Sequence, residues 1–339
     1  MNIEEIVKIT GGKLLSGDPA KDVAPSSIST DSRTIKNGEF FIALNGANFR
    51  GSDFVEASFK KGAVGAIAED FPPDVKKYKK IAIKVKDTTT AFQDIARHHR
   101  MKFGIPVIAV TGSNGKTTVK EMIACILSRK YNILKNEGTK NNQIGVPQTL
   151  LKLKRVHEAC ILELGTSRRG EIRNLSYIAR PDICVITNIG PSHLEFLGDL
   201  KGVYEAKKEI LEFLNGSGVA VLNGDDKFLS KVKGGKIRII KFGLGISNDF
   251  RADHISIERD RSRFRLNNKE EFELRLLGLH NIYNALAAIA VSRHFGVNHS
   301  LIRKAISGYR PVNMRLEVEK IGGFQIVNDG ADIRKRDPA

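Results

Sequence analysis

Residues 107–118 read Val107-Ile108-Ala109-Val110-Thr111-Gly112-Ser113-Asn114-Gly115-Lys116-Thr117-Thr118, an apolar strand followed by a glycine-spaced turn and Lys-Thr-Thr. Glycines let backbone N–H groups close around phosphate oxygens, and the N-terminus of the next helix adds its positive dipole end. In such a loop Lys116 reaches the terminal phosphates and the Thr117 hydroxyl binds Mg2+. The usual pattern has a glycine where Val110 stands, so this is a shortened P-loop. We predict a nucleotide-phosphate site formed by Gly112, Ser113, Asn114, Gly115, Lys116, Thr117 and Thr118, rather than a merely structural turn.

The segments around this loop have the patterns of a parallel α/β sheet. Apolar residues at helical spacing follow the loop at positions 119, 122, 123, 126 and 127, as in a helix that packs on a sheet. Strand and helix patterns then alternate to about residue 312. We expect strands at 105–110, 158–164, 182–188 and 218–223, a shorter, partly antiparallel annex at 236–242, 251–258 and 262–266, a helix at 279–295, and a last strand pair at 315–320 and 323–328.

The first 98 residues have the pattern of a separate, small α/β domain, with strands at 40–44 and 66–68 and a helix at 55–61. A hinge is expected at 98–104. The predicted fold class is therefore α/β. It consists of a small N-terminal α/β domain at 1–98, a central P-loop parallel-sheet domain at 99–312, and a short further segment at 313–339.

Composition excludes several classes of protein. The 339 residues carry a formal charge of +17, but the lysines are scattered and form no basic helix, which argues against nucleic-acid binding and suits anionic small molecules. No apolar run approaches the ~20 residues that span a bilayer, and the N-terminus is not that of a secretion signal. Cys125, Cys160 and Cys184 lie far apart in apolar segments and are expected to be reduced thiols. We predict a cytoplasmic protein without membrane insertion.

Polar residues at the carboxyl ends of the expected strands are candidates for ligand binding, because open parallel sheets bind ligands at that edge. Glu163 closes one strand, Asn188 closes the next, and His193 follows in the loop. A carboxylate and a histidine beside a P-loop could hold magnesium directly or through water. The alternatives are a strand-end salt bridge for Glu163 and a backbone-bonded loop histidine for His193.

Lys207 lies in a helix expected at about 200–214, near the middle of the apolar stripe formed by Leu200, Val203, Ile210, Leu211 and Leu214. A lysine that points inward must be paired, neutralised or modified, because an unpaired buried charge is too costly. Carbamylation by carbon dioxide would turn the ammonium into a carboxylate-like group. The alternative is that the side chain extends to a nearby rim.

Asn281 and Asn284 are three residues apart near the start of the helix at 279–295, so they share one face and could bind a base edge. Taken together with the runs above, they make the chain resemble the Mur ligase family of peptidoglycan synthesis. The resemblance covers roughly residues 1–329. It is carried by Thr111–Thr118, Asn141-Asn142-Gln143-Ile144-Gly145-Val146-Pro147, Glu163-Leu164-Gly165 with Gly170-Glu171-Ile172, His193-Leu194-Glu195, Glu205-Ala206-Lys207 and Gly278–Ala288.

Within that family the chain is similar to the branch that adds D-alanyl-D-alanine to UDP-N-acetylmuramoyl-tripeptide. The resemblance implies an ATP-dependent ligase that forms an acyl phosphate on the tripeptide carboxylate, which the dipeptide amine then attacks. It implies a cytoplasmic monomer with ATP and Mg2+ as cofactors.

The resemblance also implies roles for particular residues. Lys116, His193 and Lys207 would be catalytic; Thr117 and Glu163 would serve one Mg2+, and His193 and carbamylated Lys207 a second. Asn281, Asn284, Arg315 and Asp329 would bind ATP together with the P-loop. Ser32, Arg33, Asn141 and Asn142 would bind the UDP-substrate.

The end of the chain departs from the family pattern, since Gly330-Ala331-Asp332 stands where a tyrosine and an NANP turn are usual. From this departure we expect 313–339 to be the remnant of a C-terminal ligase domain. We also expect the isolated chain to bind the UDP-substrate but form little amide. Other readings are a related ligase such as folylpolyglutamate synthase, or a non-catalytic remnant that binds a nucleotide or UDP-sugar.

Overall fold

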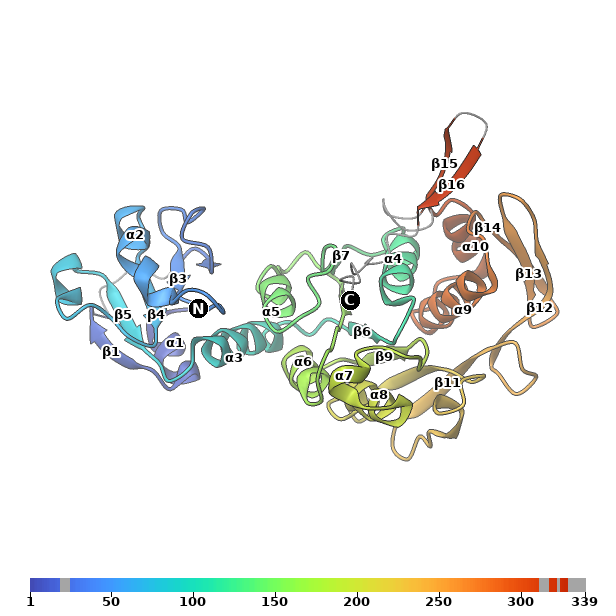
Figure 1. Cartoon of the computed structure of the whole chain (residues 1–339), viewed down its shortest axis with the longest axis horizontal. Helices are drawn as coiled ribbons and strands as arrows, with labels where there is room; N and C mark the ends of the chain where they lie inside the picture. Colours follow the sequence, from blue (N-terminus) through green and yellow to red (C-terminus); the bar gives the residue numbers. More distant parts are fainter. Residues whose placement is uncertain (19–24, 311–316, 322–323, 329–339) are drawn as a thin grey trace, which may run out of the picture. The chain divides into compact units, whose positions relative to one another are not determined.

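The computed structural model describes residues 1–18, 25–310, 317–321 and 324–328 (Figure 1). The chain divides into two compact units. The first comprises Met1–Gly104, Lys140–Arg155 and Tyr177–Ala179; the second comprises Ile105–Thr139, Val156–Ser176 and the described residues from Arg180 onward. Residues 140–155, which the sequence analysis assigned to the central domain, thus belong by their contacts to the first unit. No described helix is long and apolar enough to cross a membrane.

The first unit is built on a five-stranded sheet in the order β1-β5-β4-β3-β2, in which only the β1–β5 pair is antiparallel. The expected strands at 40–44 and 66–68 and the helix at 55–61 are confirmed as β3, β4 and α2. The expected hinge at 98–104 is wrong in its first half, because helix α3 continues to Met101. The elements are α1 (Ile3–Thr10), β1 (Lys13–Ser16), β2 (Ile28–Ser29), β3 (Phe40–Ile42), α2 (Val55–Lys60), β4 (Gly65–Ala68), β5 (Ile81–Lys84), α3 (Thr88–Met101) and α5 (Gly145–Leu150).

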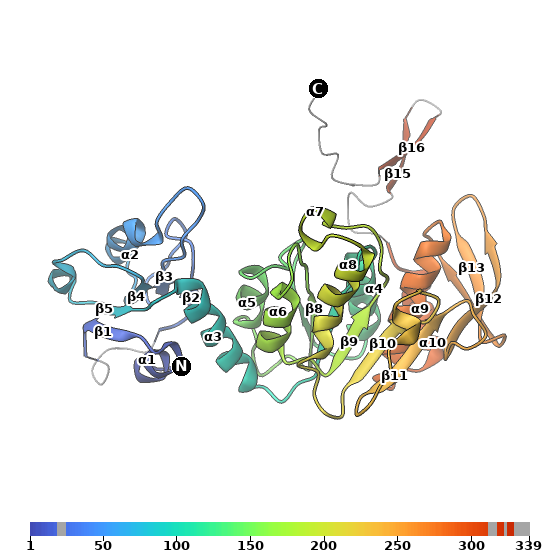
Figure 2. The ribbon, with the colours of Figure 1, turned by 60° about the horizontal axis from the view of Figure 1, so that its bottom comes forward.

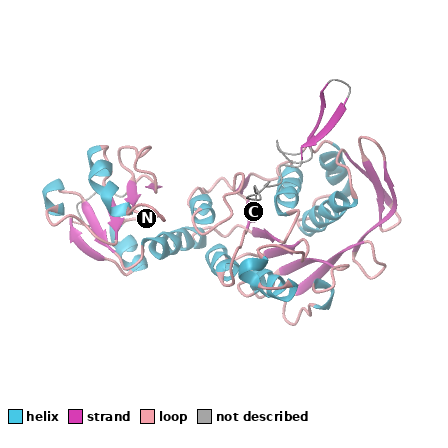
Figure 3. Cartoon of the chain, viewed as in Figure 1, coloured by secondary structure: helices cyan, strands magenta, loops and turns pink. Residues whose placement is uncertain are grey.

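The second unit contains a nine-stranded sheet in the order β14-β13-β12-β11-β10-β9-β6-β8-β7. Figure 3 shows its strands in magenta among the cyan helices. The strands are β6 (Val107–Thr111), β7 (Ile133–Lys135), β8 (Ala159–Glu163), β9 (Ile183–Ile186), β10 (Val219–Asn223), β11 (Arg238–Gly243), β12 (Phe250–Ile257), β13 (Ser262–Leu266) and β14 (Glu270–Leu274). All four expected strands of the parallel sheet are confirmed.

Helices cover both faces of the part of this sheet between β7 and β11. Helices α4, α9 and α10 lie on one face, and α8 lies on the other (Figures 1 and 2). The apolar face of α4 is fully buried, including Val119, Ile123 and Leu127, as its helical spacing requires. The helices are α4 (Lys116–Leu127), α6 (Glu171–Ala179), α7 (Leu194–Leu197), α8 (Leu200–Lys208), α9 (Leu279–His294) and α10 (His299–Ser307).

Two expectations for the second unit need correction. The segments at 236–266 are partly antiparallel, as expected, since β12–β14 pair antiparallel, but they are not an annex: β11 pairs in parallel with β10 over five residues and with β12, so all belong to the same sheet. The helix expected at 200–214 ends at Lys208 and is followed by a 3₁₀ turn, Glu209–Leu211. The expected last strand pair is confirmed as the antiparallel hairpin of β15 (Glu317–Ile321) and β16 (Phe324–Asn328).

Strand β6 lies at the point where the order of strands reverses, with β8 on one side and β9 on the other. Chains that leave neighbouring parallel strands toward opposite faces open a crevice at the carboxyl end of the sheet. The P-loop follows β6 directly, so the fold puts it in this crevice. The loops after β8 and β9 are then its nearest neighbours.

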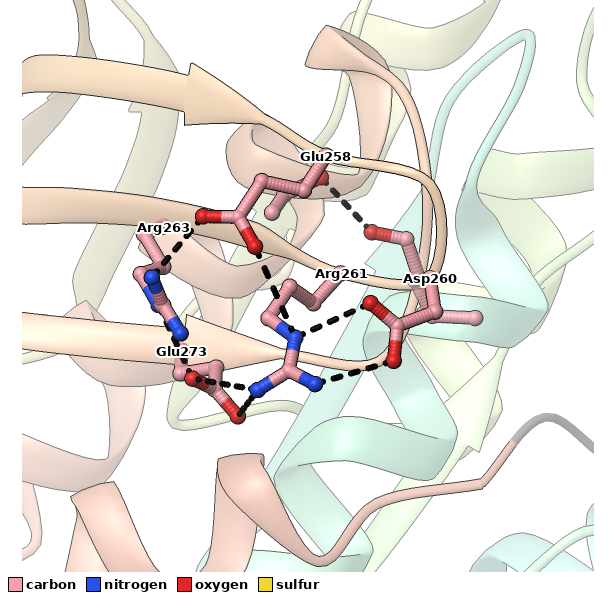
Figure 4. A network of polar contacts seen from close by, with 7 residues as sticks. Glu258, Asp260, Arg261, Arg263 and Glu273 are labelled. Carbon is pink, nitrogen blue, oxygen red and sulfur yellow. Dashed lines mark hydrogen bonds and ion pairs between the residues drawn. The ribbon is translucent and has the colours of Figure 1, made fainter.

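The outer strands β12–β14 combine an aromatic pair with a surface ion network. Phe264 and Phe272 are buried and stack with ring centroids 5.5 Å apart. On the surface, Arg261 contacts Asp260 at 3.0 Å and Glu273 at 3.4 Å, and Arg263 joins Glu273 at 3.0 Å to Glu258 at 2.8 Å (Figure 4). Exposed pairs of this kind contribute little to stability, whereas a buried aromatic pair contributes much.

We predict that Phe272→Ala lowers the free energy of unfolding of the second unit by about 3–5 kcal/mol, because it leaves a cavity beside Phe264. Glu273→Gln, on the adjacent position, should shift the urea midpoint only slightly, and the shift should vanish at high salt. Urea unfolding followed by circular dichroism measures both. Equal shifts for the two variants would contradict this assignment of stability.

Candidate functional site

The P-loop closes around its own lysine. Lys116 Nζ donates to the carbonyl oxygens of Gly112 at 3.0 Å and Ser113 at 3.1 Å. Gly112 has φ of 148°, and an added Cβ would collide with the Thr187 hydroxyl. Gly115 has φ of 80° and packs so closely on the Asn284 side chain that a Cβ would collide with its oxygen. Both glycines are therefore required by backbone conformation and by close packing.

The loop after β9 fixes the P-loop through a side-chain amide. Asn188 Oδ1 accepts from the backbone N of Asn114 at 3.0 Å, and Asn188 Nδ2 donates to the backbone O of the same residue at 3.1 Å. Ser113 N donates to Asn188 O at 3.0 Å, and Ser113 Oγ exchanges hydrogen bonds with the backbone of Gly190. Asn188, which the sequence made a candidate for ligand binding at a strand end, thus holds the backbone of the phosphate loop.

The Glu163 carboxylate, at the end of β8, meets the first turn of α4. Thr117 Oγ1 donates to Glu163 Oε2 at 2.8 Å, and Glu163 is only 2% exposed. The structure therefore brings together the two residues that the sequence assigned to one Mg2+. A hydroxyl and a carboxylate at the mouth of a P-loop are the hard oxygen ligands that Mg2+ prefers, so the residues present fit the ion.

Sequence reasoning missed a buried polar group behind Glu163. Lys120 is 0% exposed, and its Nζ donates to Asn136 O at 2.8 Å and lies 3.1 Å from Glu121 Oε1. The Asn136 side chain accepts from Glu163 N at 2.9 Å and donates to Glu163 O at 3.1 Å. A signal for Lys120 was present, since it lies at the edge of the apolar stripe of α4. No sequence signal pointed to Asn136.

Lys207 points inward, as predicted, and is 2% exposed. Its pKa falls from 10.5 to about 7, because burial disfavours the charged ammonium and because Lys116 adds a like-charge repulsion. Lys207 therefore lies within electrostatic reach of the P-loop. A lysine that is substantially neutral near pH 7 can react as a free amine.

His193 is exposed and begins helix α7 in a left-handed backbone conformation with φ of 51°. The described residues place it in the loop that also carries Asn188 and Gly190. In the ranges 1–18, 25–310, 317–321 and 324–328, no group of three or more His, Cys, Asp or Glu is arranged to hold a metal. The metal role of His193 stays a prediction.

The start of α9 and the P-loop line one cavity of about 540 Å³. Asn281 and Asn284 are both buried in its wall; Asn281 Nδ2 donates to Leu277 O at 2.8 Å and Asn284 Nδ2 donates to Asn281 Oδ1 at 3.1 Å. The structure thus brings together the P-loop and the asparagines that the sequence assigned to adenine. The cavity is lined by Asn114, Gly115, Thr118, Thr187, Asn188, Asn223, Phe242, Leu279, His280, Asn281, Tyr283 and Asn284.

A second polar cluster, not anticipated from the sequence, lies at the rim of this cavity. Tyr283 donates its hydroxyl to Asp225 Oδ2 at 2.8 Å, and Asn248 Nδ2 donates to Asp225 Oδ1 at 2.8 Å. Burial and the Asp225 carboxylate raise the pKa of Tyr283, so its hydroxyl stays protonated. Asp225 also accepts from the backbone N–H of Leu244 and Gly245, which ties the β11–β12 loop to α9.

The residues assigned to the UDP-substrate lie in the first unit. Arg33 is exposed and forms a two-pronged ion pair with Asp31 at 2.8–2.9 Å, which lowers the pKa of that carboxyl to about 2. Lys61 Nζ donates to the carbonyl oxygens of Ser32 at 3.0 Å and Arg33 at 3.1 Å. These bonds fix the backbone of the Ser32–Arg33 turn.

The segment of Asn141 and Asn142 is joined to that turn within the same unit. Gln148 Nε2, from α5, donates to Thr30 Oγ1 at 2.9 Å. Asn142 Oδ1 accepts from the backbone N of Gly145, the first residue of α5, at 2.9 Å. Gln148 is a link that sequence reasoning missed. Arg315 and Asp329, assigned to ATP, lie outside the described residues.

The three cysteines are free thiols, with Cys160 and Cys184 buried and Cys125 half-buried, as expected. Chemically, the second unit can bind an anion at a helix N-terminus and a planar group against α9. It can also present a carboxylate and a lysine of lowered pKa beside the anion. That combination suits phosphoryl transfer from a nucleoside triphosphate.

Comparisons with known families agree with this description. The model of the Mur ligase middle domain matches residues 110–292, and that of the Mur ligase family catalytic domain matches residues 25–100. Among curated proteins, the chain is 37% identical over 330 residues to UDP-N-acetylmuramoyl-tripeptide--D-alanyl-D-alanine ligase of Bacillus subtilis, covering 97% of this chain and 71% of that protein. The Escherichia coli ligase of the same name is 34% identical over 335 residues, which cover 97% of this chain and 72% of that protein.

Solved structures are similar over the same range. MurF from Acinetobacter baumannii superposes with a TM-score of 0.88 at 32% identity, covering 97% of this chain and 72% of that one. MurF from Thermotoga maritima, solved in complex with ADP, gives a TM-score of 0.80 at 28% identity and covers 89% and 70%.

We predict that Asn188→Ala weakens ADP binding about tenfold or more, because the P-loop loses two hydrogen bonds of about 1 kcal/mol each. Titration calorimetry measures the dissociation constant. Asn298→Ala is the matched control: its side chain accepts from Leu301 N at 2.8 Å as the cap of α10, far from the P-loop in sequence, and its loss should leave ADP affinity unchanged. Unchanged affinity in Asn188→Ala would contradict the positioning role.

Proposed function

We propose that this chain, which belongs to the Mur ligase family of ATP-dependent ligases, adds D-alanyl-D-alanine to UDP-N-acetylmuramoyl-tripeptide in peptidoglycan precursor synthesis. The observation that carries the proposal is the cavity lined by both the P-loop and the α9 asparagines, beside a Glu163 carboxylate that accepts from Thr117 of the same loop. Both the Bacillus subtilis and Escherichia coli relatives are ligases for these substrates. The reaction would form an acyl phosphate on the tripeptide carboxylate, which the amine of the dipeptide attacks.

In this proposal ATP binds with its phosphates on the P-loop and its adenine against the start of α9. Lys116 then leaves the carbonyl oxygens of Gly112 and Ser113, to which it bonds at 3.0–3.1 Å, and turns to the phosphates. Asn281 is held by the Leu277 carbonyl, so it presents a fixed face to the base. Arg315 and Asp329 are proposed as further ATP contacts.

The Thr117 hydroxyl and the Glu163 carboxylate would hold a Mg2+ ion, which when bound neutralises phosphate charge during transfer. Asn136 fixes the backbone of Glu163 and Thr117 orients its carboxylate, so the ligand is ready before the ion arrives. His193 and Lys207 are proposed as the groups for a second ion.

Carbamylation of Lys207 would remove a repulsion and create an attraction. The ammonium form is disfavoured by burial and by Lys116, which together lower the pKa to about 7. A carbamate at this position carries a negative charge and would pair favourably with Lys116 or with a metal. We therefore propose that Lys207 acts as the carbamate.

Ser32, Arg33, Asn141 and Asn142 are proposed to bind the UDP-substrate. Three hydrogen bonds within one unit fix these segments: Lys61 donates to the Ser32 carbonyl, Gln148 donates to Thr30, and Asn142 accepts from the backbone N of Gly145. Arg33 is exposed and offers a guanidinium for a diphosphate once it leaves Asp31.

The experiment that tests the function is calorimetry of this chain with UDP-N-acetylmuramoyl-tripeptide, carrying either lysine or diaminopimelate as third residue. Saturable binding of at least one tripeptide is expected, and a folate monoglutamate should not bind. Mass spectrometry of mixtures with ATP, Mg2+ and D-alanyl-D-alanine identifies the amide product. Binding of the folate and not of either tripeptide would overturn the proposal.

We predict that Lys116→Ala abolishes UDP-substrate-dependent release of ADP, because the transferring phosphates lose their principal cation. Binding of the UDP-substrate should be unchanged, since Ser32 and Arg33 lie in the other compact unit. Coupled ADP detection and calorimetry measure the two effects. Turnover close to that of the unsubstituted chain would refute the role of Lys116.

For Lys207 we predict a carbamate signal in ¹³C NMR with labelled bicarbonate, absent in Lys207→Ala and retained in Lys208→Ala, whose side chain pairs with Glu205 at 3.3 Å. The signal should grow as pH rises through about 7, because only the neutral amine reacts. Short carboxylates should restore part of the activity of Lys207→Ala. An identical signal in Lys207→Ala would show that the signal does not come from a carbamate on Lys207.

The same pKa gives a stability prediction with a defined sign. Because the folded pKa of Lys207 lies below its ordinary 10.5, the unfolded chain binds more protons between about pH 7 and 10.5. Without bicarbonate, the buried Lys207 ammonium lowers the free energy of unfolding by its full amount below about pH 7. This destabilisation decreases as the pH rises from about 7 to 10.5. Lys207→Met should therefore stabilise the chain most at pH 6, as urea unfolding can show.

A further inference from the structure

We infer that Lys120 is a positioning residue of the nucleotide site: its buried ammonium holds the Glu163 carboxylate in place for a magnesium–nucleotide complex. The inference rests on the proposed function for the identity of the nucleotide and the ion. Neither the family match nor the sequence patterns assign a role to Lys120.

Lys120 lies one helical turn after Lys116, on the side of α4 that faces the sheet. It is 0% exposed, and its Nζ has an oxygen contact in three directions: Asn136 O at 2.8 Å, Glu121 Oε1 at 3.1 Å and Glu163 Oε2 at 4.0 Å. Burying an ammonium costs far more free energy than burying an apolar side chain of the same size. Packing alone therefore does not account for a lysine here.

The oxygen of Glu163 nearest to Lys120 is the oxygen that Thr117 uses. Thr117 Oγ1 donates to Glu163 Oε2 at 2.8 Å, and Lys120 Nζ lies 4.0 Å from the same atom. Both side chains come from α4, three residues apart, so one helix holds a single carboxylate oxygen through two side chains. Glu163 is 2% exposed, so solvent does little to hold it in this orientation.

Asn136 joins the main chain of Glu163 to the same ammonium. The Asn136 side chain accepts from the backbone N of Glu163 at 2.9 Å and donates to its backbone O at 3.1 Å. The backbone carbonyl of Asn136 accepts from Lys120 Nζ at 2.8 Å. Lys120 thus acts on the carboxylate directly and on the strand end through Asn136. Loss of the ammonium would release both at once.

The charges of this cluster balance within the protein. Lys120 and Lys135 both pair with Glu121, and Glu163 is the remaining acid, which gives two cations and two anions. The charge of the Glu163 carboxylate is therefore compensated within the cluster, by an ammonium that lies near the same oxygen to which Thr117 donates. A preorganised carboxylate of this kind loses little orientational freedom when a cation binds.

The test is the linkage between Mg2+ and ADP, measured by calorimetry of the full chain as the ratio of ADP dissociation constants without and with Mg2+. We expect Lys120→Met, which keeps the volume but removes the charge, to lower this ratio at least about fivefold. Lys120→Gln, which keeps a donor for the Asn136 carbonyl, should also lower it and serves if the methionine variant does not fold. Glu163→Gln should lower the ratio as well.

Met122→Ala is the structural control, since Met122 is a buried core residue of α4. It should lower the melting temperature and leave the ratio unchanged. A folded Lys120 variant with an unchanged ratio would overturn the inference, and so would a raised ratio, which would mean that Lys120 mainly repels the ion. Failure of the proposed function would look different: the ratio would respond as expected while neither UDP-tripeptide bound.

Discussion

The constraint on which the site depends is the need to keep the charged carboxylate of Glu163 at the end of a buried parallel strand. A carboxylate that is 2% exposed must be compensated by the protein itself. Asn136, directly after strand β7, bonds its backbone, and helix α4 contributes Thr117 and Lys120 beside its Oε2 atom. The same helix begins with the P-loop lysine, so the position of Glu163 fixes the phosphate site relative to the sheet.

The opposite side of the P-loop is fixed by β9 rather than by β8. Asn188 bonds the N and the O of Asn114, as Asn136 bonds the N and the O of Glu163. In both cases a side-chain amide replaces the backbone pairing that a strand loses where the sheet ends. Because β6 lies between β8 and β9, the loop that follows it is held from both sides, and it needs little reorganisation to accept an anion.

How much the sequence could predict follows from how local each signal is. The strand, turn and helix around residues 107–127, the four parallel strands and the inward side of Lys207 are properties of single segments, and each is confirmed. The pairing of β11 with β10 was missed because the residue pattern of a strand does not indicate which other strand it pairs with. The role of Asn136 could not be predicted for the same reason, since its bonds to Glu163 depend on β7 lying beside β8. The compact units likewise assign residues 140–155 through contacts of α3 with α5 that no segment reveals alone.

Lys120 and Lys207 show two solutions to one physical problem. Both lie at or near the apolar stripe of a helix, and both are almost fully buried. Lys120 Nζ lies beside two carboxylates and donates to a backbone carbonyl, so the protein itself supplies the partners of its ammonium. Lys207 instead has its pKa lowered to about 7 by burial and by Lys116, so its charge can change. A site that must gather phosphates needs permanent positive charge, whereas a group that must change charge needs an environment that disfavours the ammonium. The two lysines differ in the charged residues around each ammonium: carboxylates surround Lys120, whereas Lys207 is near the cation Lys116.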